Sequence, residues 1–265
     1  MTETEDPDKY AAATENLDKF GEKLVKLVEE LLASRSIVVS QITYRVKSRS
    51  STYKKLQSNP AKYRVISDLT DLLGVRIVTF FPNQVDTVGQ IIKDEFKVDD
   101  THSVDKRLAL DYDRFGYLSL HHVATLNEAR ATLCENAIFA NTSAEFQVRS
   151  ILQHVWAEIE HDLGYKAEST VPEDVRRRFS RLAGLLEIAD TEFQAIRDQQ
   201  ITYTARVGTQ VKISLGNLLL DRISITAYIS NSPTISDTDG KLAQVFRTRL
   251  QAENDVSAWV RLFLR

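Results

Sequence analysis

Residues 143–166 change their periodicity part-way, and this change constrains the fold more than any other feature of the sequence. In "SAEFQVRS" polar and apolar residues alternate, as in a β-strand with one buried face. From Ser150 to about residue 165 the apolar residues recur at helical spacing instead. A strand followed directly by a helix is a unit of a layered α and β fold. The sequence therefore predicts a mixed sheet flanked by helices.

The chain up to residue 168 repeats this alternation. Further strands are predicted at 36–46, 72–81, 97–107 and 116–126, and helices at 8–34, 50–57 and 82–95. These strands are too short for a barrel, so we expect an α+β domain over residues 1–168.

Residues 169–265 are predicted to form a second, mainly helical extension that serves in docking, oligomerisation or regulation. Thr170 to Glu173 has the form of a capping box. Apolar residues then recur at steps of four and three, as in a coiled-coil seam: Val175, Phe179, Leu182, Leu186, Ala189, Phe193 and Ile196. We expect this seam to pack on the first domain or on a partner helix. Residues 230–240 are predicted to be a loop and 241–252 one more helix.

Composition excludes several classes of protein. The net charge of −3 over 265 residues carries no whole-chain signature of nucleic-acid binding. Cys134 is the only cysteine, so no intrachain disulfide can form. The acidic N-terminus lacks the basic and apolar blocks of a signal peptide, and the apolar runs are short for a membrane span. We expect a cytoplasmic protein with no membrane partner.

Polar side chains are predicted to gather on one face of two strands. Glu145, Gln147 and Arg149 share a face because strand side chains alternate. Tyr117, Ser119 and His121 likewise share a face, and this set of side chains suits a nucleobase or a sugar. Either a lined cleft or a solvated sheet face explains the pattern.

Charged residues near the strand at 72–81 allow two interpretations. An arginine within an apolar strand, such as Arg76, must find an anion or a stacked ring, and taken alone a structural salt bridge is favoured. Asp71 lies just before that strand. The basic stretch upstream is either a phosphate-binding cluster or a plain basic surface; it contains Arg45, Lys47, Arg49, Lys54 and Lys55.

The helix predicted over 150–165 carries a polar stripe that consists of His154, Glu158, His161 and Tyr165. Two histidines with a glutamate raise the question of zinc. However, His154 and His161 are two helical turns apart, roughly 10 Å, so one zinc ion does not easily bridge them. The HExxH spacing of metallohydrolases is absent.

Five short motifs, in order between residues 40 and 168, resemble the synthetase domain of the RelA/SpoT family. They are Arg45, Lys47 and Ser51; Asp71, Gly74, Arg76 and Ile77; Gly116, Tyr117, Ser119 and His121; Glu145, Gln147 and Arg149; and Trp156, Ala157, Ile159, Glu160, His161, Tyr165 and Lys166. The resemblance implies a nucleotidyltransferase-like fold. About 40 residues precede the match, which suggests a short, synthetase-only relative.

The resemblance implies a pyrophosphokinase that transfers the β,γ-diphosphate of ATP to the ribose 3′-hydroxyl of GDP or GTP and releases AMP. Asp71 and Glu145 would be the catalytic residues and would hold Mg²⁺, which prefers carboxylate oxygens. Glu145 could also assist deprotonation of the attacking hydroxyl.

The resemblance also implies two nucleotide pockets. The ATP-binding residues would be Arg45, Lys47, Ser51, Lys54 and Arg76, with the two arginines flanking the adenine and the two lysines on the triphosphate. The acceptor-binding residues would be Tyr117, Ser119, His121, Gln147, Arg149 and His154, with Tyr117 stacked on the base.

Two departures leave the acceptor open. Many relatives have a basic residue where this chain has Leu118. The segment before Gly116 is hard to align, and its candidate phosphate contacts are Lys106, Arg107 and Arg114.

One alternative function is that of a toxic relative, paired with an antitoxin, that modifies the 3′ end of tRNA or an adenine nucleotide. Four arginines could offer tRNA a basic surface, although a solvated helix face is the favoured explanation for them: Arg176, Arg177, Arg178 and Arg181. The other alternative is a catalytically inactive binding module. We also expect a homo-oligomer through the C-terminal helices.

Overall fold

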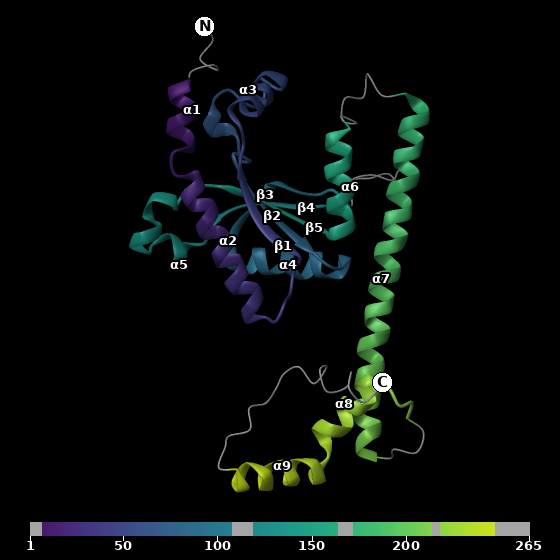
Figure 1. Cartoon of the computed structure of the whole chain (residues 1–265). Helices are drawn as coiled ribbons and strands as arrows, with labels where there is room; N and C mark the ends of the chain where they lie inside the picture. The colour runs from purple at the N-terminus through teal and green to yellow at the C-terminus, as the bar shows by residue number, and fades with distance from the viewer. Residues whose placement is uncertain (1–6, 108–118, 164–171, 214–217, 247–265) are drawn as a thin grey trace. The chain divides into compact units, whose positions relative to one another are not determined.

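A computed structural model describes residues 7–107, 119–163, 172–213 and 218–246 (Figure 1). The chain divides into two compact units, residues 1–194 and 195–265. The domain boundary expected after residue 168 stays a prediction, although the first compact unit includes the beginning of the long C-terminal helix. In the described stretches no helix has the length and apolar character needed to cross a membrane.

The first unit is built on one five-stranded sheet, and the predicted mixed fold is confirmed. The strands are β1 (Gln41–Val46), β2 (Leu73–Thr79), β3 (Phe96–Asp105), β4 (Leu120–Leu126) and β5 (Ala144–Ser150), in the order β1-β2-β5-β4-β3. β2 and β5 are parallel, and the other neighbours are antiparallel. The central pair therefore brings together segments that are far apart in sequence.

Helices flank this sheet on both faces. They are α1 (Pro7–Thr14), α2 (Leu17–Ser34), α3 (Arg49–Ser58), α4 (Pro82–Glu95), α5 (Glu128–Ala131) and α6 (Ile151–Asp162), with 3₁₀ turns at Ile66–Asp68 and Cys134–Phe139. α2 and α4 form a single core with the odd positions of β2 and the even positions of β5, as Phe20, Val88, Val75 and Phe146 show. The opposite face, which carries Arg76 and Glu145, is left for a cleft.

Gly21 allows α2 to lie close to the sheet. A Cβ atom at this position would stand 2.2 Å from Cδ2 of Tyr44 on β1, which is far inside van der Waals contact. Any larger residue at position 21 would therefore separate α2 from β1.

Two helix boundaries differ from the prediction. The helix expected over 8–34 is broken at residues 15–16, and α2 begins after Asn16, a residue type that favours N-caps. The loop predicted at 230–240 is wrong, because helices α8 (Arg222–Asn231) and α9 (Pro233–Val245) occupy it. Pro233 follows Ser232 and occupies the first turn of α9, where proline is favoured, so "SNSP" marks a helix start. Residues 247–252 of the last predicted helix lie outside the described residues.

The long helix α7 (Glu173–Ile213) contains the predicted apolar seam. Phe179 and Ala183 are buried against Trp156 and Ala157 of α6, and Val175 and Leu186 pack on this cluster. The rest of the seam is more open. Leu182 is 53%, Phe193 55% and Ile196 50% exposed. Only the N-terminal part of the seam thus packs against α6.

Candidate active site

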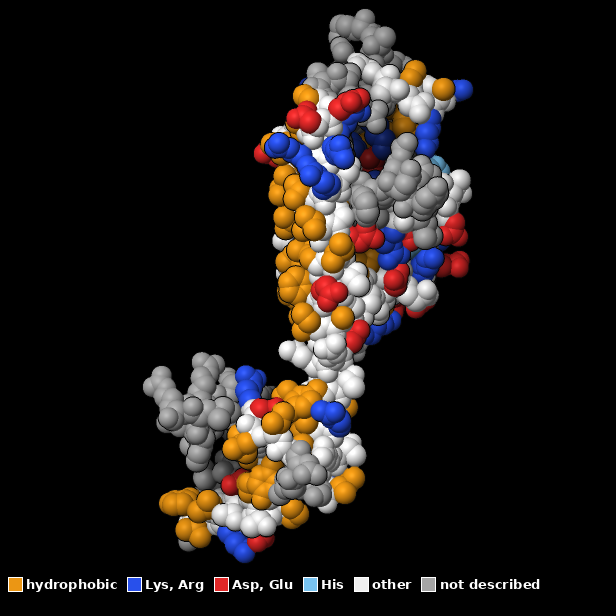
Figure 2. Space-filling model, turned by 90° about the vertical axis from the view of Figure 1, so that its right-hand side faces the viewer, with side chains coloured by type: hydrophobic (Ala, Val, Ile, Leu, Met, Phe, Trp, Pro, Cys, Tyr) orange, Lys and Arg blue, Asp and Glu red, His pale blue; other side chains and the backbone are white. Residues whose placement is uncertain are grey.

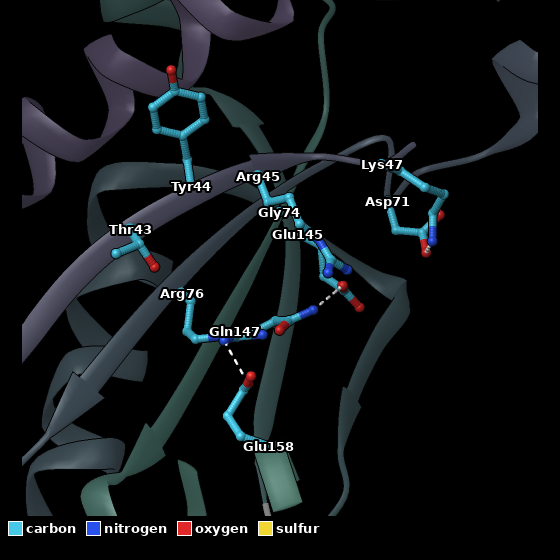
Figure 3. Close-up of a pocket in the computed structure, with 10 residues that line it drawn as sticks. All are labelled: Thr43, Tyr44, Arg45, Lys47, Asp71, Gly74, Arg76, Glu145, Gln147 and Glu158. Atoms are coloured by element: carbon cyan, nitrogen blue, oxygen red, sulfur yellow. Dashed lines mark hydrogen bonds and ion pairs between the residues drawn. The ribbon is translucent and has the colours of Figure 1, made fainter. Parts of the chain in front are cut away.

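A cleft of about 320 Å³ opens on the sheet face that α2 and α4 leave uncovered (Figure 3). Its walls come from β1, β2, β5 and α6. The lining residues are Thr43, Tyr44, Arg45, Lys47, Asp71, Gly74, Arg76, Glu145, Gln147 and Glu158. The structure thus brings both predicted metal carboxylates and three of the predicted ATP-binding residues to one cavity.

Strand register explains why these side chains meet. Gly74 pairs with Arg45 on one side and with Glu145 on the other. Arg76, two residues on, pairs with Gln147. Side chains two apart on a strand share a face, so both rows point into the cleft. Because Gly74 has no side chain, the space between Arg45 and Glu145 stays open.

Asp71 is held by two lysines. Its Oδ2 lies 2.9 Å from Nζ of Lys47 and 2.7 Å from Nζ of Lys55. Its other oxygen, Oδ1, is buried and has no hydrogen-bond partner among the described residues. A buried carboxylate oxygen without a donor is unfavourable unless a cation or a donor arrives. Asp71 is therefore prepared to receive a positive charge.

Lys54, predicted to contact the triphosphate, is exposed and does not line the cleft. Its neighbour Lys55 points toward Asp71 instead. Helical spacing does not separate the two lysines, because Lys54 and Lys55 lie three and four residues after Ser51 and both spacings share a helix face. Ser51 itself is exposed in the first turn of α3, where its backbone N–H bonds Oγ of the N-cap Ser48 at 3.3 Å.

Glu145 is the most constrained carboxylate of the cleft. Its Oε1 lies 2.8 Å from His121 Nδ1, and its Oε2 accepts from Gln147 Nε2 at 2.6 Å. Burial alone would raise the pKa of Glu145. The hydrogen bonds from His121 and Gln147, with the charges of His121 and Lys106, outweigh burial and hold that pKa at about 2. Glu145 therefore carries its negative charge at neutral pH.

Arg76 forms the ion pair that the sequence favoured, with Glu158 of α6 at 2.7 Å. Beside it, His154 Nε2 lies 3.0 Å from Nε2 of Gln41. Burial, together with the positive charges of Arg149 and Arg76, lowers the pKa of His154, against the opposing effect of Glu158. His154 is therefore kept neutral at physiological pH.

The predicted acceptor residues are only partly brought together in the described part of the chain. Gln147 lines the cleft. Ser119, His121 and Arg149 are buried behind it, at 0%, 6% and 2% exposure. Tyr117 lies outside the described residues, as do Gly116, Arg114, Tyr165 and Lys166.

The cleft fits a hard divalent cation. Mg²⁺ is usually bound by one or two carboxylates and completes its shell with water and phosphate oxygens. Asp71 and Glu145 supply two carboxylates, and the buried Oδ1 of Asp71 supplies an unsatisfied oxygen. Among the described residues no group of three or more His, Cys, Asp or Glu side chains is arranged for a metal. An all-protein zinc site is thus not found in these residues.

Residues 44–170 match a family model described as the region found in RelA / SpoT proteins. The match covers 127 of the 265 residues, and over this stretch the chain is similar to the RelA/SpoT region. The matched RelA/SpoT region contains every predicted site residue.

Individual proteins extend this result. GTP pyrophosphokinase YjbM of Bacillus subtilis is 28% identical over 159 residues, which cover 60% of this chain and 72% of the relative. The crystal structure of small alarmone synthetase 1 from Bacillus subtilis superimposes with a TM-score of 0.61 at 23% identity, over 74% of this chain and 99% of that one. The same synthetase bound to its product pppGpp gives a TM-score of 0.61 at 22% identity, over 74% and 99%. These structures establish the RelA/SpoT synthetase fold.

Proposed function

We propose that this protein is an ATP-dependent pyrophosphokinase that makes (p)ppGpp. It transfers the β,γ-diphosphate of ATP to the ribose 3′-hydroxyl of GDP or GTP, and AMP leaves. The observation that carries this proposal is the convergence of Asp71 and Glu145 with a row of cations in one cleft. The name of the curated relative and the bound product of the similar structure support the same reaction.

The cations of the cleft suit a nucleoside triphosphate. Arg45 and Arg76 present planar guanidinium groups, which stack on adenine rings. Lys47 and Lys55 meet at Asp71, and a triphosphate offers them a larger negative charge. We infer that the two amino groups turn from Asp71 to the phosphates when ATP binds. That movement would free both oxygens of Asp71.

Asp71 and Glu145 would hold Mg²⁺ between them and the phosphates. The ion would screen the negative charge that builds up during phosphoryl-type transfer. Efficient general bases have a pKa near the operating pH. A pKa of about 2 makes Glu145 a poor proton acceptor, so the metal-binding role is favoured over the deprotonation weighed from the sequence.

A labelling experiment tests the reaction and the acceptor together. The protein is incubated with γ-³²P-labelled ATP, magnesium and, in separate reactions, GMP, GDP, GTP, ATP or bulk tRNA. We expect label on GDP and GTP, and none with the Glu145→Gln variant. Label on tRNA alone would support the toxic alternative, and label on no acceptor would support the inactive binding module.

We also propose that a second copy of this chain covers an apolar face of α6 and α7. Val155 and Ile159 of α6 are 45% and 49% exposed, and Leu182 and Leu185 of α7 are 53% and 61% exposed. Figure 2 shows hydrophobic side chains gathered in a band along α7. Exposed apolar side chains that gather on one face often mark a protein–protein interaction site.

The charges beside this band suit an antiparallel pair of α7 helices. Arg181 and Glu192 are eleven residues apart, close to three full turns, so they lie on the same flank of the helix. Both are exposed. In an antiparallel pair, residues on the same flank face each other, so each arginine would meet the glutamate of the other copy. This complementarity favours a second copy over an unrelated partner.

A further inference from the structure

Both oxygens of the Glu145 carboxylate are fixed by donors that are themselves fixed. His121 holds Oε1 at 2.8 Å, and Gln147 holds Oε2 at 2.6 Å. Behind His121, the hydroxyl of Ser119 lies 2.5 Å from Nε2. Gln147 is held in turn by Arg149, whose Nη2 donates to Oε1 of Gln147 at 3.1 Å. Glu145 thus stands at the meeting point of two hydrogen-bonded chains.

The chemistry of these groups determines the direction of the hydrogen bonds that reach Glu145. An ionised carboxylate only accepts hydrogen bonds, so Nδ1 of His121 must carry a proton. Nε2 accepts from the hydroxyl of Ser119 when the imidazole is neutral and donates to that hydroxyl when the imidazole is protonated. A guanidinium group only donates, so the amide oxygen of Gln147 faces Arg149 and its NH₂ group faces Glu145.

The outer members of the network are poorly placed to touch a nucleotide. Ser119, His121 and Arg149 are at most 6% exposed, and none of the three lines the cleft. His121 pairs in register with Gln147, and Val123 with Glu145, so His121 reaches Glu145 diagonally from β4. Its imidazole therefore lies on the same face of the sheet as the Glu145 carboxylate and beside it, where it is buried.

We propose that Ser119, His121 and Arg149 are positioning residues that hold Glu145 as a metal ligand. Each carboxylate oxygen has about two lone-pair sites, so one on each oxygen stays available for a cation after the bonds to His121 and Gln147. This inference rests on the proposed function and replaces the acceptor contact expected for Ser119, His121 and Arg149.

Two substitutions of one residue test the role of His121. In His121→Asn the side-chain NH₂ stands near the place of Nδ1 and can still donate to Glu145. In His121→Gln the NH₂ stands near the place of Nε2 and cannot. Loss of a residue that orients a metal ligand lowers metal affinity or activity about 10- to 100-fold. We expect that loss in His121→Gln and a clear recovery in His121→Asn.

The first measurement needs no turnover. Binding of Mn²⁺ in the presence of a non-hydrolysable ATP analogue is followed by the electron paramagnetic resonance signal of free Mn²⁺. His121→Gln should weaken binding about 10-fold or more, and Ser119→Ala should weaken it less. His102→Gln is the matched control, because His102 also lies 2.8 Å from a carboxylate, that of Asp99, but outside the cleft. It should leave Mn²⁺ binding unchanged.

The second measurement is steady-state kinetics of the folded variants, checked by their melting temperatures. His121→Gln should lower kcat while the KM values for GDP and ATP change little, because a positioning residue does not touch either nucleotide. A raised KM for GDP at unchanged kcat would make His121 an acceptor contact and overturn the proposal. Equal Mn²⁺ affinity in His121→Asn, His121→Gln and the unmodified protein would also overturn it. An inactive unmodified protein would instead refute the proposed function, since Mn²⁺ binding is measured independently.

Discussion

Lys55 and Asp71 form an ion pair of 2.7 Å that joins helix α3 to a residue two positions before strand β2. Lys47 reaches the same carboxylate oxygen at 2.9 Å. In this arrangement the anion needed for a metal neutralises one of the two cations needed for a triphosphate. One net positive charge therefore remains at this cluster before either substrate binds.

Lys55→Ala should weaken binding of a non-hydrolysable ATP analogue about 10- to 100-fold, because a hydrogen bond to a charged group contributes about 1.5–3 kcal/mol. Lys54→Ala is the matched control and should change affinity little, since Lys54 is exposed. Isothermal titration calorimetry of both variants measures this. Equal losses in the two variants would contradict the assignment of Lys55.

The stability of the protein should depend on Glu145 in mild acid. The folded pKa of Glu145, about 2, lies below its ordinary value of 4.5, so its stabilisation is present above pH 4.5 and is lost as the pH falls toward 2. A shift of this size corresponds to at most about 3 kcal/mol in the free energy of unfolding. Urea titrations from pH 6 to pH 3 should show the unmodified protein losing more stability than Glu145→Gln. Parallel pH curves for the two proteins would argue against this shift.

Arg76→Ala should weaken ATP binding selectively. Loss of a stacked partner costs about 1–3 kcal/mol, which is roughly a 5- to 150-fold change in affinity. Titration with the ATP analogue and, separately, with GDP measures both pockets, and Tyr117→Ala should show the opposite selectivity. If Arg76→Ala weakens GDP as much as the ATP analogue, the two-pocket assignment fails.

Leu185→Glu should convert the proposed oligomer to monomer, because burying an unpaired carboxylate in an apolar contact is strongly unfavourable. Thr191→Glu adds the same group six residues on, well away from the apolar band, and should keep the native assembly. Analytical ultracentrifugation at several protein concentrations distinguishes them. A monomeric unmodified protein would contradict the proposed assembly.

The sequence predicts the strands well where burial alone decides them. Phe146 and Val148 face the core while Glu145 and Gln147 line the cleft, as alternation requires. It fails where local signals compete. "SNSP" looks like a loop, yet Pro233 begins a helix.

The site residues show the same division between local and long-range information. Spacing within α3 limits the choice to Lys54 and Lys55, and the contact with Asp71, which lies outside α3, decides for Lys55. The hydrogen bond between His121 and Glu145 could not be deduced, because it depends on the pairing of β4 with β5. Strand order and register are properties of the assembled sheet.

The parallel pairing of β2 with β5 couples the substrates to folding. Asp71 precedes one strand and Glu145 lies on the other, so an unfolded chain holds these carboxylates far apart. A ligand that binds only the native state raises the unfolding free energy by mass action. ATP and its metal would then act as a thermodynamic clamp between the two central strands, and the melting temperature should rise with their concentration. The ATP present in a cell would thus help to keep β2 paired with β5.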